Sequence, residues 1–82
     1  MNISILTPDR KVFEGEATSV KVPGTAGQFE VLSHHAALVS SLAAGEVRLI
    51  KADGSRQTYT IGGGFIEVLK NEVSLLVQGL KE

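Results

Sequence analysis

Cysteine is absent from the 82 residues of this chain, so no disulfide supports the fold and no cysteine-ligated zinc site forms. An excess of positive charge is absent too, because 8 Lys and Arg residues stand against 9 Asp and Glu residues. The basic residues are scattered singly, except for Arg10-Lys11, and form no basic stripe. Nucleic-acid-binding domains normally show a clustered positive excess, so the composition argues against a nucleic-acid partner.

Long apolar runs are also missing. No stretch approaches the roughly 18–20 residues that span a bilayer, and the N-terminus lacks the basic start and apolar run of a secretory signal. We therefore expect no direct insertion into a membrane. The length allows one small domain, and residues 1–82 are expected to form it without a linker or an internal repeat.

Turn-forming residues occur at short and regular intervals along the chain, which is typical of a small sandwich or barrel. Three segments between them alternate between apolar and polar residues and are predicted to be strands: Thr18–Val22, Glu46–Lys51 and Glu72–Val77. The pair Asp53-Gly54 tolerates the positive φ angles of a tight hairpin, so the strand before it should pair with Gln57–Ile61. The sequence therefore predicts an all-β domain.

The second half of the chain is expected to continue as an antiparallel meander, with turns at Gly62-Gly63-Gly64 and at Lys70-Asn71. The segment His34–Ala44 does not fit this pattern as clearly. It is rich in alanine and leucine and is followed by Gly45, a residue typical of helix C-termini. Local pattern alone leaves a helix and an extended conformation open for this segment.

Residue types that often carry chemistry are present but do not converge. His34 and His35 would point to opposite faces of a strand, and the chain has no HxH or HExxH spacing for a metal. The three glycines at 62–64 precede an apolar β-type run instead of the helix that a phosphate-binding loop requires. The carboxylates are dispersed along the chain. We therefore expect no catalytic residue, no metal and no cofactor.

Apolar residues occupy both faces of the last two predicted strands. Phe65 and Leu69 alternate with Ile66 and Val68, and Leu76 lies opposite the face of its buried neighbours. A two-layer sandwich buries only one face of each strand, so the surplus indicates a surface for a partner. Scattered exposed apolar residues or a local bulge are the alternative explanation.

The run VPGTAGQFEVLSHHAAL, at residues 22–38, resembles the epsilon subunits of F-type ATP synthases. The resemblance extends to VFEG and ATSV before it, and to LAAGEV, IGGGFIEV and the last strand after it, in the family's order and spacing. It therefore covers essentially the whole chain. Four positions depart from the family's usual residues: Glu30, Ser33, His34 and Ala37.

The resemblance implies a flattened sandwich of two antiparallel sheets and a non-catalytic role in the rotor. Members of the family bind the gamma subunit and the c-ring, and thereby couple ion-driven rotation to ATP synthesis. The implied location is peripheral to the inner (plasma) membrane, on its cytoplasmic side, within the synthase. Family members commonly continue into a C-terminal helical hairpin that restrains hydrolysis, and in some members binds ATP. Since this chain ends at Glu82, neither inhibition nor nucleotide binding is expected of it.

Site residues are implied by position within the family's motifs. The positions close to gamma are Thr7, His35 and Ser40, and those facing the c-ring are Ala26, Gln28, Phe29 and Glu30. Two other classes remain as alternatives: a generic β-sandwich adaptor of another complex, and a small enzyme or ligand-binding domain with a deep polar pocket.

Overall fold

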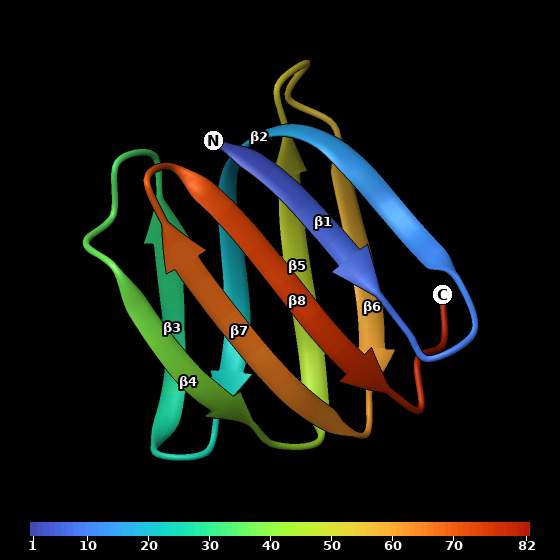
Figure 1. The fold of residues 1–82 in the computed structure, drawn as a ribbon. Helices are drawn as coiled ribbons and strands as arrows, with labels where there is room; N and C mark the ends of the chain where they lie inside the picture. The colour runs from blue at the N-terminus through green and yellow to red at the C-terminus, as the bar shows by residue number, and fades with distance from the viewer.

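Eight β-strands and no helix make up the chain in a computed structural model that describes residues 1–82 (Figure 1). In chain order the strands are β1 (Asn2–Leu6), β2 (Lys11–Gly24), β3 (Gly27–Leu32), β4 (Leu38–Leu42), β5 (Gly45–Lys51), β6 (Arg56–Ile61), β7 (Gly63–Leu69) and β8 (Glu72–Gln78). The predicted all-β fold is confirmed. The structure has no helix of a length and hydropathy suited to crossing a membrane.

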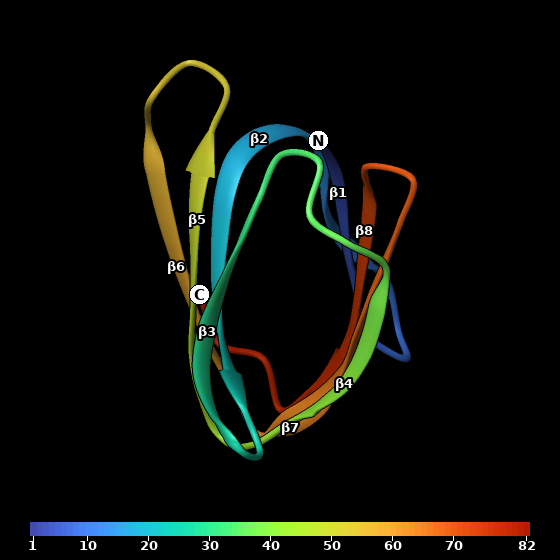
Figure 2. The same cartoon turned by 90° about the vertical axis from the view of Figure 1, so that its left-hand side faces the viewer.

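The strands form two facing layers (Figure 2). One layer has the order β1-β8-β7-β4, and the other has the order β3-β2-β5-β6. Strand β2 takes part in both, because its first half pairs with β1 and its second half lies between β3 and β5. A register shift between Ala17 and Ser19 marks the change from one layer to the other, as expected of a β-bulge that bends a strand.

The core lies between the layers and follows from the period-two pattern of the strands. Val20 and Val22 of β2 face Ile66 of β7 and Leu75 of β8 across it, and each of the four is fully buried. In total, 17 buried apolar residues form one cluster. Complete burial of one such side chain contributes about 1.5–3 kcal/mol, so this cluster is the main source of stability.

Both predicted hairpin turns are confirmed. At the first, the Lys51 amide donates to the Ser55 carbonyl over 2.9 Å, and the Asp53 carboxylate accepts from the Ser55 amide and hydroxyl over 2.8 and 2.6 Å. These hydrogen bonds from Ser55 lower the pKa of Asp53. At the second, Lys70 and Asn71 have positive φ angles of 50° and 62°. Asparagine adopts this conformation more readily than most residues, so its presence there supports the tight turn.

Two features of the topology differ from the predictions. The second half is not a continuous meander, because β6 and β7 do not pair and Gly62 carries the chain from one layer to the other. The layers are not wholly antiparallel either, because β1 pairs with β8 in parallel along its full length. Both differences arise from pairings between segments distant in sequence, which local turn signals do not encode.

The segment His34–Ala44, for which helix and strand were both open, contains no helix, and its residues Leu38–Leu42 form β4. Strand β4 pairs antiparallel with β7 from Leu38↔Val68 to Leu42↔Gly64, so pairing and burial override the helical propensity of its alanines and leucines. The turn before it contains His34, which has a φ of 65°. The His34 amide donates to the Asn71 side-chain oxygen over 2.8 Å, and this bond joins the β3–β4 turn to the β7–β8 turn.

Candidate interaction surface

Four large apolar side chains are exposed on the outer face of the β1-β8-β7-β4 layer. They are Val39, Phe65, Leu69 and Leu76, which are between 52% and 71% exposed, and we call them the apolar face. The alternation of β7 and β8 produces this face, since the neighbours of these residues point into the core. The predicted surplus of apolar residues on both faces of β7 and β8 is thereby confirmed.

The strand register places part of the apolar face in one row across the layer. Ser41 pairs with Phe65, Phe65 with Leu76, and Leu76 with Leu6. Phe65, Leu76 and Leu6 line a shallow hollow of about 220 Å³ together with Thr7 and Pro8. A partner's side chain placed in this hollow would contact apolar groups on several sides, as side chains do in the centre of a protein–protein interface.

Two of the three residues that resemblance assigns to the gamma contact lie at opposite ends of this layer. Thr7 follows β1 and lines the hollow, and its amide donates to the Arg10 carbonyl over 2.9 Å. His35 is half-buried in the β3–β4 turn, at the end where Asn71 lies. Ser40 is half-buried on β4, on the same side of the strand as Leu38 and Leu42, which pack towards the core. Thr7 and His35 thus lie at the ends of the layer that carries the apolar face, Ser40 lies on the core side of β4, and the three residues do not form a cluster.

The four residues assigned to the c-ring lie at the β2–β3 turn and along β3. Ala26 and Gln28 are exposed, whereas Phe29 is half-buried and packs against the core. Glu30 is exposed on β3, and its carboxylate accepts a hydrogen bond of 2.5 Å from the hydroxyl of Ser19. Ala26 and Gln28 are thus exposed to solvent at the turn, while Phe29 anchors β3 by packing against the core.

Val39 is the most exposed large apolar residue of the face, and the sequence pattern did not identify it. Its position became interpretable only once β4 was known to be extended, because it alternates with Leu38, which packs against the core. Had the sequence assigned this segment firmly to a strand, the alternation of Leu38 with Val39 would have predicted that Val39 is exposed.

Burial raises the pKa of Tyr59, which lies in the core on β6 and not on the apolar face. No group of three or more His, Asp or Glu side chains is placed to hold a metal ion. The most distinctive feature of this face is its apolar surface, which suits contact with another protein.

Comparison with known proteins gives one consistent relationship. Residues 1–82 match the family described as ATP synthase, Delta/Epsilon chain, beta-sandwich domain. The chain is 45% identical over 76 residues to the ATP synthase epsilon chain of Chlorobaculum tepidum, covering 93% of this chain and 86% of that protein. It is 38% identical over 74 residues to the ATP synthase epsilon chain of Dichelobacter nodosus, covering 90% of this chain but 52% of that protein.

Solved structures with the same fold come from mitochondrial ATP synthases. A chain in the OSCP/F1/c-ring structure from Euglena gracilis superposes with a TM-score of 0.90 at 22% identity, over 96% of this chain and 51% of that one. A chain in the central stalk and c-ring structure from Tetrahymena thermophila superposes with a TM-score of 0.83 at 16% identity, over 100% of this chain and 66% of that one. At such identities these likenesses establish the fold.

Proposed function

The chain belongs to the delta/epsilon β-sandwich family of ATP synthase, and on this premise we propose that it binds the gamma subunit and the c-ring as part of the rotor. Its family is one of accessory chains of the synthase and not of its catalytic subunits. In the proposed role, residues 1–82 act as one epsilon-type domain that fastens gamma to the ring. Rotation driven by ion flow then reaches the catalytic subunits.

The observation that carries the gamma contact is the apolar face. Stable protein–protein interfaces bury about 800 Å² on each partner, which is about a sixth of the 4664 Å² surface of this chain. One face of the sandwich therefore has enough area. Val39, Phe65, Leu69 and Leu76 supply the desolvated centre, while Thr7 and His35 lie at its ends.

The c-ring contact is assigned to the β2–β3 turn. Ala26 and Gln28 are exposed there, and the backbone is held by the Thr25 amide, which donates to the Ser41 carbonyl over 3.1 Å. A fixed turn loses little conformational entropy on binding, which favours an interface that must persist through rotation. The proposed location follows from these partners: the membrane periphery on the cytoplasmic side, without insertion of this chain.

Copurification with gamma tests the proposal as a whole. We expect a stable one-to-one complex between this chain and the gamma subunit of the same organism in size-exclusion chromatography. A generic adaptor would instead copurify with another complex from a lysate and would leave purified gamma unbound. That result would reject the rotor role.

We expect His35→Asp to weaken binding to gamma by at least about tenfold. His35 is half-buried at the end of the proposed contact, and a carboxylate there would lose its hydration without gaining a partner, at a free-energy cost on the order of 1–3 kcal/mol or more. A calorimetric titration with purified gamma measures the change. His35→Asn is the matched control, since it keeps a polar group of similar size without the charge; unchanged affinity of the Asp variant would exclude His35 from the interface.

We expect Glu30→Lys to lower retention of the c-ring by about threefold to tenfold if Glu30 faces a basic residue of the ring, as reversing an exposed charge pair would do. The amount of c-ring recovered with the affinity-purified complex measures this, together with ATP-driven ion pumping. Ser19→Ala is the matched control, because it removes the same hydrogen bond to Glu30 without reversing a charge. Equal recovery with the wild-type chain and the Glu30→Lys variant would remove Glu30 from the c-ring contact.

A further inference from the structure

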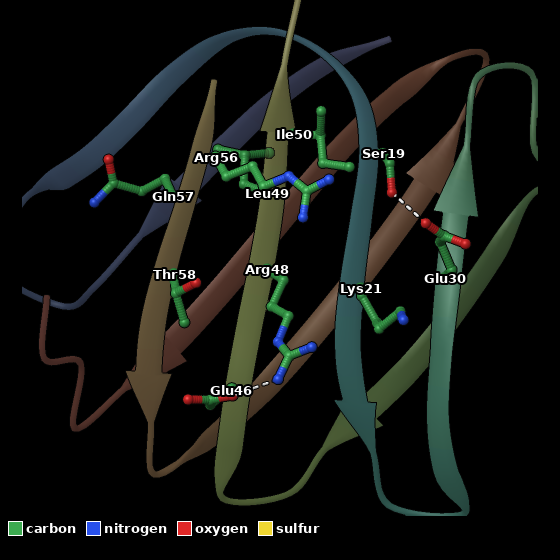
Figure 3. Close-up of a pocket in the computed structure, with 10 residues that line it drawn as sticks. All are labelled: Ser19, Lys21, Glu30, Glu46, Arg48, Leu49, Ile50, Arg56, Gln57 and Thr58. Atoms are coloured by element: carbon green, nitrogen blue, oxygen red, sulfur yellow. Dashed lines mark hydrogen bonds and ion pairs between the residues drawn. The ribbon is translucent and has the colours of Figure 1, made fainter. Parts of the chain in front are cut away.

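The outer face of the β3-β2-β5-β6 layer, opposite the apolar face, carries a polar groove of about 390 Å³ (Figure 3). Its volume falls in the range of small-molecule sites, roughly 300–1,000 Å³. Three of its lining residues are cations from three different strands: Lys21 on β2, Arg48 on β5 and Arg56 on β6. The expectation that basic residues are only scattered is therefore wrong at this place.

Strand register brings two of these cations directly opposite each other. Lys21 pairs with Arg48 in the β2–β5 ladder, and like charges at directly opposed positions destabilise a sheet. Arg56 belongs to the neighbouring row, opposite Ile50. Figure 3 shows its side chain extending from β6 across β5 towards β2, so that the guanidinium groups of Arg56 and Arg48 both lie between β5 and β2, whereas the Lys21 side chain points towards β3.

The two carboxylates of the groove offset only part of the charge of its three cations. Glu30 lies directly opposite Lys21 in the β2–β3 ladder, and its carboxylate accepts a hydrogen bond from the largely buried hydroxyl of Ser19. Glu46 pairs with Arg48 over 3.1 Å at the far end of the groove. The ion pairs of the chain include neither Lys21 nor Arg56.

From this convergence we propose that the groove is a binding site for a phosphate group. Guanidinium groups bind phosphate through two parallel hydrogen bonds, and Arg48 and Arg56 bring two such groups to the space between β5 and β2. Free phosphate and a small phosphate ester share this chemistry. The site lies on the layer opposite the one proposed to contact gamma, so it is independent of the gamma contact, and it shares Glu30 with the proposed c-ring contact.

Nuclear magnetic resonance titration of the chain tests the proposal. Inorganic phosphate and glycerol phosphate are the probes, and sodium chloride holds the ionic strength constant. We expect saturable shifts of the backbone amides of Lys21, Arg48 and Arg56 with at least one probe, and the tighter probe identifies the source of the phosphate group. Shifts that do not saturate with either probe, or that chloride alone reproduces, would overturn the proposal.

Variants of charged residues distinguish binding in the groove from attraction by diffuse charge. R56Q and R48Q should each weaken phosphate binding by at least about fivefold, whereas R10Q, at an exposed arginine in the β1–β2 turn, should leave it unchanged. E46Q should strengthen binding, because it frees the Arg48 guanidinium from its ion pair. Equal weakening by R10Q and R48Q, or no gain from E46Q, would show that only diffuse charge attracts the anion and would reject the site. None of these variants should alter binding to gamma.

Discussion

Replacing Gly64 with alanine should leave the chain largely unfolded near its normal working temperature. A Cβ atom at Gly64 would lie 2.2 Å from the Leu76 carbonyl oxygen and 2.8 Å from the Val77 Cα. Both contacts are with the backbone of β8, so a side-chain rotation cannot relieve them. Gly64 also has a φ of 148°, which other residues rarely adopt. Strand β8 would have to move away from β7.

The expected loss is large relative to the total stability of the domain. At 0.05–0.15 kcal/mol per residue, a chain of this size is stable by about 4–12 kcal/mol. Separating β8 from β7 disturbs core residues as well as pairing, and losses above about 4 kcal/mol are typical of such severe overlap. That corresponds to a fall of about 20 °C or more in the midpoint of thermal unfolding for a domain of this length, measured by circular dichroism.

Gly27→Ala is the matched control for the conformational part of this effect. Gly27 has a φ of 134°, but a Cβ atom there would meet nothing within 4 Å. The Gly27→Ala variant should therefore lose only the stability that backbone strain costs, about 1–3 kcal/mol, and should remain folded. Similar falls in the unfolding midpoint for the two variants would mean that crowding of residue 64 against β8 contributes nothing to the loss of stability.

Much of the fold could be predicted because its signals are local. Asp53-Gly54 and Lys70-Asn71 identify hairpins since the chemistry of each turn is contained within a few residues. The parallel pairing of β1 with β8 could not be predicted in the same way, because Asn2 and Glu72 meet only after the intervening strands have assembled. Strand β4 was ambiguous because its composition favours a helix and its pairing with β7 decides otherwise.

The two surfaces differ in how far the sequence reveals them. The apolar face was visible in part, because Phe65 and Leu76 alternate with buried residues within single strands. The groove was not visible, because Lys21, Arg48 and Arg56 come from three strands and reach one face only through the registers of β2 with β5 and of β5 with β6. Alternation within a strand is a property of sequence, whereas a row across strands is a property of topology.

Phe65→Asp should reduce the affinity for gamma by about a hundredfold or more while leaving the domain folded. Phe65 is 57% exposed and lies in the middle of the row that runs from β4 to β1, so its removal costs the core little. Aromatic residues at the centre of an interface commonly contribute about 2–4 kcal/mol, and a carboxylate would in addition be buried without a partner. Titration calorimetry with gamma measures the loss, and circular dichroism checks the fold.

Leu32→Asp provides the matched control, because it makes the same kind of change at a similarly exposed residue on the other layer. Leu32 is 53% exposed and lies on β3, outside the apolar face. If gamma binds the apolar face, Leu32→Asp keeps wild-type affinity and Phe65→Asp loses it. Equal losses would indicate that any added negative charge weakens the complex, and a loss confined to Leu32→Asp would place gamma on the β3-β2-β5-β6 layer. The pair of variants therefore identifies which layer of the sandwich contacts gamma.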